Sequence, residues 1–393
     1  MRFVRAALSL PGLRLAVVSQ EPITRLPDDI RERLAAFARV SNALDADELV
    51  TGVREVANTM GGPPHSLIGI LEQAQVPLAD ARARLGLPGT SPAAARNFRD
   101  KARMKDILRE HGLPCARHAL ARSTQDAAAA AARFGYPVVV KPPAGAGAKA
   151  TVRVADRAQL EQHLATQQPS ASSPVLVEEF IKGREFSFDT ITLAGRHLFH
   201  SVNSYSPTPL EVVQTPWIQW CVLLPREQRM PAFDAIWDAG PRALDALGMH
   251  TGMSHMEWFL RSDGSIAISE VAARPPGAQF MTLLSWAHDC DFYRAWAELV
   301  TFGRVAIPPR RFATGAAYLR AQGDGGKITA VAGLEQVREE LGELVVEVKP
   351  PESGQSPTGT YEGEGYVIVR HEDTRVVQRA LERIVDLVRV RLG

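Results

Sequence analysis

Apolar and polar positions along the first 95 residues follow strand and helix periods in turn. The run Leu13 to Ser19 is mostly apolar, which predicts a buried strand, and polar turn residues follow it. Helical patterns are expected at 27–39, after Asp45 and at 71–85. This alternation is typical of a small parallel α/β unit, which we place over residues 1–95. The turn-rich stretch 86–92 marks its boundary.

The next part of the chain shows helices with clear ends and short apolar strands. Gly112 and Pro114 stop a helix that begins near Arg99. Ser123 is placed to cap an alanine-rich helix that ends near Phe134. The other expected elements are strands at 136–141, 151–154 and 175–177 and a helix at 157–167. Together they predict a compact α+β unit.

Strand patterns predominate from residue 185 onward. The expected strands are at 185–192, 197–202 and 365–369, with turn residues at 350–365. The stretch 203–224 has no readable motif. A final helix begins at Asp373, and its apolar stripe indicates core packing.

Asp263-Gly264, between two apolar runs, is a strong signal for a two-residue hairpin turn. In that register Glu257 falls opposite Glu270, with Cβ atoms roughly 5 Å apart, where like charges destabilise a sheet. The same register pairs Ser262 with Ser265 and Phe259 with Ile268. A divalent cation between the carboxylates would remove the penalty, and Mg²⁺ usually takes one or two carboxylates plus substrate phosphates. The alternative is two solvated glutamates on an exposed strand face.

Lys141 ends an apolar run, so it is expected where a buried strand reaches a cleft and an ammonium group can hold a phosphate oxygen. The loop Gly145 to Lys149 has no bulky side chains before its final lysine, so its backbone N–H groups could approach a polyphosphate. It is neither a P-loop nor a dinucleotide fingerprint, because the required glycines and the Lys-Ser/Thr pair are missing. A simply exposed lysine is the alternative.

Two further strand-like pieces meet at Lys182-Gly183, with acidic residues on both sides of the turn. An adenine held between lobes needs backbone donors and acceptors beside an apolar surface, and a ribose diol needs a carboxylate acceptor. The chain therefore presents, in order, a strand ending in lysine, a glycine loop, an acidic turn and paired glutamates. That order indicates a metal–nucleotide site more specifically than any one element.

Composition limits the other functions. Hydrophobic content of 45%, charged content of 23% and a net charge of +1 are ordinary for a globular enzyme and give no argument for a nucleic acid or membrane partner. Three scattered cysteines in no metal-ligand spacing suit a reducing cytosol. Pro11 and Arg14 interrupt the N-terminal apolar segment, which argues against export. No uncharged stretch approaches the ~18 residues of a spanning helix.

These motifs resemble the ATP-grasp superfamily of carboxylate–amine ligases, and in particular its L-amino-acid and dipeptide ligase-like branch, where His-x-Glu and Glu-x-x-x-Arg recur. The matching positions span about half of the chain: Asp100-Lys101, Lys141 with Gly145 and Gly147, Glu178 to Ile181, Glu185, His255-x-Glu257 and Glu270 to Pro275. The resemblance implies an α/β and α+β chain with the ATP-grasp fold. It also implies a Rossmann-like (pre-ATP-grasp) domain at 1–95, a catalytic domain at 96–310 with a lid at about 113–180, and a C-terminal α+β portion at 311–393.

The resemblance also implies roles around ATP and Mg²⁺, with Mn²⁺ as an alternative metal. The expected nucleotide contacts are Lys101, Lys141, Gly145, Gly147, Glu178, Glu179, Phe180 and Ile181, with Glu185 at the ribose hydroxyls. Glu257 and Glu270 would bind the metal, and Arg274 would stabilise the transferring phosphoryl group or the substrate carboxylate. His255 would orient the metal site or contact the substrate; the alternative is a polar strand residue satisfied locally. Ala272 departs from the family, because many relatives place an asparagine there as a third metal ligand, and Pro276 replaces a frequent glycine.

Three tryptophans and one glutamate are further candidates for substrate contacts. Trp217, Trp220 and Trp258 are candidates for a substrate pocket, but tryptophans are more often core residues. Glu72 is expected to face solvent rather than a substrate ammonium.

The predicted activity is ADP-forming ligation of an amino acid or small carboxylic acid to an amine. A carboxylate is inert toward amines until ATP converts it to an acyl phosphate, a transfer that needs positioning and cationic stabilisation. The alternatives are an enzyme that activates formate or carbonate, as in purine or biotin pathways, and a nucleotide-binding module without catalysis. A cytoplasmic location and, on base rates, a homodimer are expected.

Overall fold

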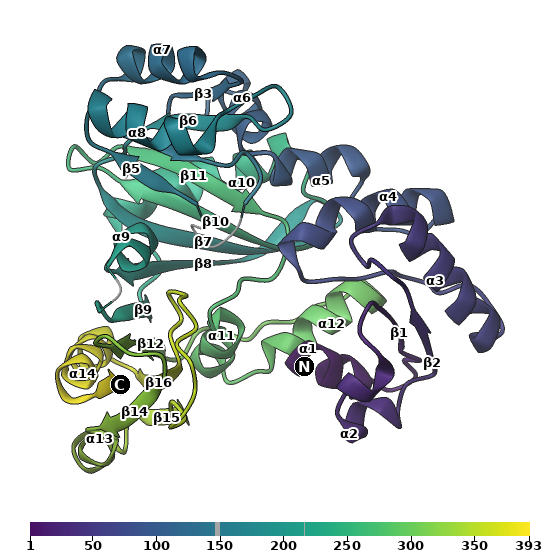
Figure 1. Cartoon of the computed structure of the whole chain (residues 1–393). Coiled ribbons are helices and arrows are strands. Elements are labelled where there is room, and N and C mark those ends of the chain that lie inside the picture. Colours follow the sequence, from purple (N-terminus) through teal and green to yellow (C-terminus); the bar gives the residue numbers. More distant parts are fainter. Residues whose placement is uncertain (146–149, 216) are drawn as a thin grey trace.

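The computed structural model describes residues 1–145, 150–215 and 217–393. Within these residues the strands form sheets of eight, four, three and two strands (Figure 1). The largest, here called the central sheet, has the order β11-β10-β7-β8-β9-β12-β16-β15. The four-stranded one, here called the small sheet, has the order β3-β6-β4-β5 and lies over one end of the central sheet (Figure 1).

The N-terminal unit pairs β1 (Ala16–Ser19) with β2 (Ala36–Arg39) in parallel. Its helices are α1 (Arg2–Leu8), α2 (Asp28–Arg31), α3 (Ala46–Met60) and α4 (Gln75–Leu85), and its 3-10 turns are η1 (Ile23–Arg25) and η2 (Glu72–Ala74). The predicted helix at 27–39 is confirmed only over α2, and its end is wrong, because residues 36–39 form β2. Ala36 and Ala38 are buried on alternate positions against β1, and this pairing outweighs the local helical pattern.

Two helices lead into the small sheet. Helix α5 (Pro92–Arg99), which the sequence pattern missed, precedes α6 (Lys101–Glu110), and Asp100 caps α6 by accepting from two backbone N–H groups. The small sheet contains β3 (His118–Ala121), β4 (Val138–Lys141), β5 (Val152–Val154) and β6 (Val175–Glu179), covered by α7 (Thr124–Phe134) and α8 (Arg157–Gln167). Ser123 caps α7 as predicted, with Oγ accepting from Asp126 N.

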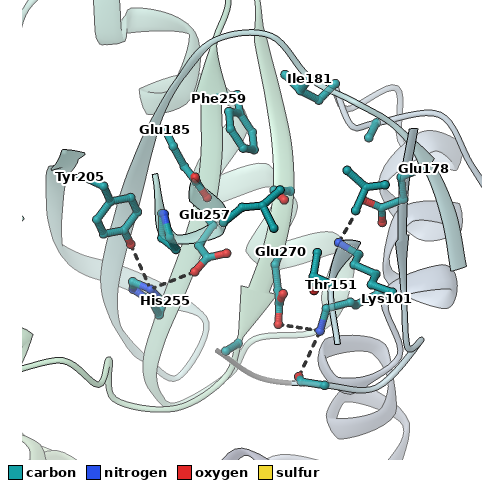
Figure 2. Close-up of a pocket in the computed structure, with 18 of the residues that line it drawn as sticks. Lys101, Thr151, Glu178, Ile181, Glu185, Tyr205, His255, Glu257, Phe259 and Glu270 are labelled. Carbon is teal, nitrogen blue, oxygen red and sulfur yellow. Dashed lines mark hydrogen bonds and ion pairs between the residues drawn. The ribbon is translucent and has the colours of Figure 1, made fainter. Parts of the chain in front are cut away.

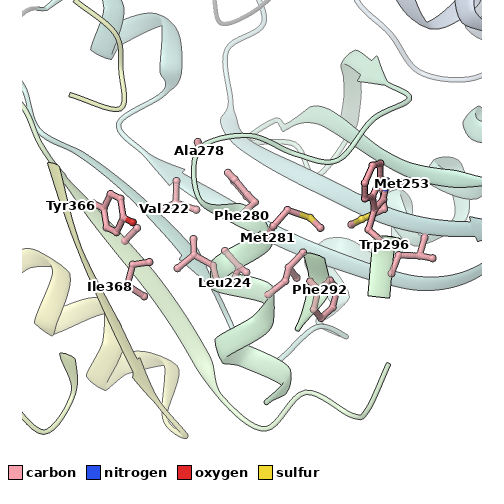
Figure 3. Packing of buried hydrophobic residues seen from close by; sticks show 14 of the residues in the cluster. Val222, Leu224, Met253, Ala278, Phe280, Met281, Phe292, Trp296, Tyr366 and Ile368 are labelled. Carbon is pink, nitrogen blue, oxygen red and sulfur yellow. The ribbon is translucent and has the colours of Figure 1, made fainter. Parts of the chain in front are cut away.

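The central sheet separates two apolar clusters. Its first strands along the chain are β7 (Arg184–Leu193), β8 (Arg196–Ser206), β9 (Trp220–Leu224), β10 (Gly252–Leu260) and β11 (Ile266–Ala272). The helices in this stretch of the chain are α9 (Pro209–Gln214), α10 (Asp234–Leu247, after η3 at Pro231–Phe233), α11 (Phe280–His288) and α12 (Phe292–Phe302). One cluster includes Val222, Phe280, Phe292 and Ile368 (Figure 3). The other packs α6 and α10 against β7 and β10, where Phe186 and Trp258 stack with ring centroids 4.9 Å apart.

The hairpin turn differs from the prediction. Arg261 N donates to Ser265 O, and Gly264 (φ +82°) lies in the left-handed region, so the loop has three residues rather than two. Phe259 consequently pairs with Ala267 rather than with Ile268, and Ser262 lies in the loop. A β-bulge at Ser269 then shifts the register by one residue and restores the predicted pairing of Glu257 with Glu270.

Some C-terminal strands complete the central sheet, and others form the separate three-stranded sheet of order β13-β17-β14. The added strands are β12 (Ala313–Leu319), β15 (Val345–Lys349) and β16 (Gly365–His371). The remaining elements are β13 (Ala321–Gln322), β14 (Ile328–Ala332), α13 (Leu334–Leu341), α14 (Thr374–Leu387) and β17 (Arg389–Leu392). Asp373 caps α14, as its sequence pattern predicted. In the part of the chain that is described, each helix is too short or too polar to cross a membrane.

Candidate functional site

The alternation of side chains along β7 and β10 creates the site. Phe186, Phe188, Met256 and Trp258 face the buried cluster beneath the sheet. Glu185, His255 and Glu257 therefore face the opposite side, where a pocket lies between the small sheet and the central sheet (Figure 2). The pocket is lined by all the predicted site residues that the structure describes: Lys101, Lys141, Gly145, Glu178, Glu179, Phe180, Ile181, Glu185, His255, Glu257, Glu270 and Arg274. Gly147 lies outside the described residues.

Glu178 is held between two lysines. Lys141 Nζ lies 2.9 Å from Glu178 Oε2, and Lys105 Nζ lies 3.4 Å from Oε1. Burial opposes ionisation of this carboxyl, but the two ammonium groups outweigh burial and lower the pKa of Glu178. The pKa of Lys105 is lowered mainly by burial. The site prediction omitted Lys105, although its position one helical turn after Lys101 places both on one face of α6.

Lys101 connects α6 to the paired glutamates. Its Nζ lies 2.8 Å from Glu270 Oε1 and donates to Gly145 O at 3.1 Å (Figure 2). Burial opposes ionisation of Glu270, but Lys101 and then Lys141 lower its pKa. The side chain of Lys101 is only 6% exposed, so this ammonium group is fixed in the pocket rather than free in solvent.

Among the described residues, Glu257 and Glu185 have no cationic partners comparable to those of Glu178 and Glu270. Figure 2 shows the carboxylates of Glu257 and Glu270 together in the centre of the pocket, with Glu185 nearby. Burial and then Glu270 raise the pKa of Glu257, and burial followed by Glu257 raises the pKa of Glu185 far above its usual range. A further positive charge at this place would stabilise all three carboxylates.

The donor set suits a hard cation that also binds phosphate. Among the described residues there is no cluster of three or more His, Cys, Asp or Glu with metal-binding geometry. Ala272 contributes no ligand atom beside Glu270. Two carboxylates fit Mg²⁺, because this ion typically keeps several waters and fills its remaining positions with substrate phosphates. The residues present are therefore compatible with Mg²⁺ held jointly by the protein and a nucleotide.

His255 is fixed by a buried polar network. Its Nδ1 lies 2.5 Å from Asp189 Oδ1, and Asn203 Nδ2 donates to Asp189 Oδ2 at 2.7 Å. The Nε2 atom lies 3.3 Å from the hydroxyl of Tyr205 and 3.9 Å from Glu257 Oε1. Burial opposes protonation, but Asp189 raises the pKa of His255. Asp189 was not predicted; a charged residue within the largely uncharged strand β7 was the available signal.

Arg274 contacts the N-terminal unit. Its Nε donates to Glu72 Oε2 at 2.7 Å, and Arg99 Nη1 lies 4.0 Å from Glu72 Oε1. Arg99 Nη1 also donates to Gly145 O at 2.9 Å. The expectation that Glu72 faces solvent is therefore wrong: the residue is 7% exposed and paired with Arg274. Its partner lies 202 positions away in sequence, a separation that local patterns do not report.

The tryptophans fall into three different environments. Trp258 is buried in the core beneath the sheet, whereas Trp217 is 65% exposed. Trp220 is buried and also lines the pocket. The preference for core residues therefore holds for Trp258, while Trp220 belongs to both core and pocket.

Comparison with known proteins agrees with this architecture. A family model described as ATP-grasp domain matches residues 106–288. The chain is 25% identical over 221 residues to an L-arginine-specific L-amino acid ligase from Bacillus subtilis, covering 55% of this chain and 52% of the relative. It is 33% identical over 162 residues to a D-alanine–D-alanine ligase from Ectopseudomonas mendocina, covering 41% of this chain and 44% of the relative. The chain thus spans about half the length of these relatives.

Solved structures match over nearly the whole chain. An L-amino acid ligase from Bacillus licheniformis superposes with a TM-score of 0.79 at 21% identity, covering 100% of this chain and 95% of that one. An N5-carboxyaminoimidazole ribonucleotide synthetase from Thermotoga maritima gives a TM-score of 0.73 at 17% identity, covering 100% and 96%. The predicted fold class is confirmed by these likenesses.

Proposed function

Because the chain contains an ATP-grasp domain within an ATP-grasp fold, we propose that it is an ATP-dependent, ADP-forming carboxylate–amine ligase. Its substrates are an amino acid or small carboxylic acid and an amine, joined through an acyl phosphate. The observation that carries the proposal is the facing pair Glu257 and Glu270 in a pocket that also contains Lys101, Lys141 and Arg274. This combination supplies anionic metal ligands and fixed cations within one cavity.

The reaction has two steps. A carboxylate oxygen of the acid attacks the γ-phosphorus of ATP, the bond to the bridging oxygen breaks, and ADP leaves. The amine nitrogen then attacks the acyl carbon, the carbon–oxygen bond to phosphate breaks, and the nitrogen loses a proton. Both steps need positioning and charge stabilisation more than a protein nucleophile.

Each residue of the pocket has its own role in binding the nucleotide, the metal or the acid. Lys101 and Lys141 contact the phosphates, and Glu178 orients Lys141 through their 2.9 Å ion pair. Phe180, Ile181 and the backbone of Glu179 border the adenine, and Glu185 binds the ribose. Mg²⁺ or Mn²⁺ held by Glu257 and Glu270 supplies neutralisation of the phosphate charge. Arg274 holds the acid carboxylate or the transferring phosphoryl group, and His255 contacts the substrate.

The remaining assignments follow the same proposal. We assign residues 1–95 to a pre-ATP-grasp domain, 96–310 to the catalytic domain with a lid at about 113–180, and 311–393 to a C-terminal portion. The free thiols of Cys115, Cys221 and Cys290 support a cytoplasmic location. A homodimer is expected, to be checked by light scattering.

Phosphate release measured against a panel of acids and amines tests the activity. The expected result is release that requires ATP, Mg²⁺, an acid and an amine together, and that Glu270→Ala abolishes. Release with formate or bicarbonate alone would instead favour a sister activity on one-carbon acids. If hydroxylamine traps no hydroxamate with any acid while ATP still binds, the chain is a nucleotide-binding module and the proposal fails.

A further inference from the structure

The pocket extends past the glutamates into an end with aromatic walls. Tyr205, Trp220, Phe280 and Tyr361 line it there. The Trp220 and Tyr361 rings meet edge to face with centroids 4.8 Å apart, and those of Tyr205 and Phe280 are 6.1 Å apart. At the opposite end the lining is the lysines and the Phe180-Ile181 segment assigned above to the nucleotide. The aromatic end is therefore the space left for the acid substrate.

We propose that this end is a subsite for a bulky apolar side chain of the acid substrate, preferably an aromatic one, and that Tyr361 determines the preference. This inference rests on the proposed function and names its substrate class. Flat apolar walls favour a flat apolar ligand, because aromatic rings gain edge-to-face and stacking contacts beyond the area they bury.

The charges around the subsite disfavour the other classes of side chain. Arg274 is the cation at this end of the described lining, and a lysine or arginine substrate would place a second cation beside it. An acidic side chain would approach Glu257 and would compete with the substrate carboxylate for Arg274. Arg274 Nη2 makes no hydrogen bond to a described residue, since Nε pairs with Glu72 and Nη1 with Pro275 O. It can therefore receive the substrate carboxylate while the side chain lies among the rings.

Tyr361 reaches the subsite from the far end of the sequence. It belongs to the connection between β15 and β16, which Glu364 anchors by accepting from Ala321 N at 2.7 Å and Thr358 N at 2.9 Å. Because Tyr361 lies outside the strands, its replacement leaves the central sheet intact. The matched control is Trp217→Ala, an exposed aromatic that does not line the pocket.

The test uses hydroxylamine as the amine and phenylalanine, leucine, alanine, arginine and aspartate as acids. Native protein, Tyr361→Phe and Trp217→Ala should prefer phenylalanine or leucine over alanine in kcat/KM by roughly 10-fold or more. Tyr361→Ala should lose most of that preference. Phosphate release with alanine, arginine or aspartate at least as fast as with phenylalanine would overturn the inference but keep the proposed function.

Calorimetry of the same amino acids in the presence of Mg²⁺ and ADP gives an answer that does not depend on turnover. The subsite is supported if phenylalanine binding weakens in Tyr361→Ala and is retained in Tyr361→Phe and Trp217→Ala. This result would support the subsite even if the protein turns over no acid, and then only the proposed ligase function would fail. Equal affinity for phenylalanine and alanine, or phenylalanine affinity unchanged in Tyr361→Ala, overturns the inference.

Discussion

At the scale of single residues, the charge of Glu257 should make the folded protein less stable when no metal is bound. Its carboxylate is partly buried near Glu270 and Glu185, and the loss of solvent contact and then Glu270 raise its pKa. Glu257→Gln removes one of these charges without changing the size of the side chain. Thermal unfolding in the absence of Mg²⁺ should therefore shift to higher temperature, while phosphate release should fall by roughly 100-fold or more.

The control for this substitution is Glu339→Gln, at an exposed position on α13. It should change neither the unfolding temperature nor turnover. If Glu257→Gln instead unfolds at a lower temperature than the native protein in the absence of metal, the carboxylate stabilises the fold, contrary to the electrostatics described above.

His288, which lies outside the pocket, should make the stability of the fold depend on pH. It is 4% exposed, its Nδ1 lies 2.7 Å from Pro308 O, and Arg310 Nε lies 3.3 Å from its Nε2. Burial, together with Arg310, lowers its pKa from 6.5 to about 4. As pH falls from 6.5 toward 4 the unfolded chain binds a proton that the folded chain does not, so the free energy of unfolding decreases, by up to about 3 kcal/mol.

Urea unfolding between pH 7.5 and 4.5 measures this effect. His288→Gln keeps a donor for Pro308 O and an acceptor for Arg310 but does not titrate, so its stability should fall less steeply across that range. His65→Gln, at an exposed position, should retain the native slope. Parallel pH curves for native protein and His288→Gln would exclude this histidine as the cause.

At the scale of elements, the sequence predicts what depends on local pattern. The caps at Asp373 and Ser123, the strand ending at Lys141 and the pairing of Glu257 with Glu270 are all present. The glutamate pairing was right although the turn was wrong, because the bulge at Ser269 compensates for the longer loop. That bulge lies where Lys105 Nζ donates to Ser269 O and Pro114 O accepts from Ile268 N.

Elements that depend on distant partners were not predictable in the same way. Strand β2 exists because β1 lies beside it, and its residues alone suggested a helix. Glu72 is buried where it pairs with Arg274 from the other end of the site, and neither residue's neighbours in sequence report that contact. The roles assigned to the site residues remain predictions, since geometry places the groups but does not show turnover.

The connection between β6 and β7 leads to a prediction about an element. A Cβ on Gly183 would lie 2.6 Å from Leu260 O, a backbone atom of the neighbouring strand β10. Gly183→Ala should therefore push this connection off the sheet, cost roughly 1–3 kcal/mol of unfolding free energy and weaken ADP binding. Urea unfolding and calorimetry with ADP measure the two effects.

Gly264→Ala is the comparison variant. Gly264 has φ +82° but open space around it, so alanine there costs about 1 kcal/mol through backbone strain without a clash. It should leave ADP affinity unchanged, because the added methyl group meets no atom within 4 Å and so displaces no part of the connection between β6 and β7. An equal loss of ADP affinity in both variants would mean that general destabilisation, not the contact with Leu260, is responsible.

At the scale of the whole molecule, the pocket is assembled from segments that are far apart in sequence. The small sheet supplies Lys141 and Glu178, and the C-terminal connection supplies Tyr361. None of the described residues of the N-terminal unit lines the pocket, but its Glu72 pairs with the lining residue Arg274. The central sheet joins strands β7 to β11 with β12, β15 and β16, so these two stretches of the chain form one continuous framework. The N-terminal unit is joined to that framework partly through the Glu72–Arg274 ion pair.

Replacement of Glu72 by glutamine tests this connection. The change leaves Arg274 without its anionic partner and Arg99 without a neighbouring charge, while the size of the side chain is kept. Removing one partner of a charged hydrogen bond at a buried position should cost about 1.5–3 kcal/mol of unfolding free energy. Because Arg274 would then lose its orientation toward the acid carboxylate, kcat/KM for the acid should fall roughly 10- to 100-fold.

The affinity for ATP separates a positional effect from general damage. Glu72 is absent from the pocket lining, whereas Lys101, Lys141 and Glu178 remain in place in the variant, so ATP binding by calorimetry should stay close to native. Glu110→Gln, exposed on α6, controls for loss of a glutamate charge and should match the native protein in all three measurements. If Glu72→Gln weakens ATP binding as much as it lowers kcat/KM for the acid, the ion pair stabilises the molecule as a whole and does not position Arg274. If kcat/KM for the acid falls while ATP affinity is retained, an N-terminal residue must help to build the acid-binding end of the pocket.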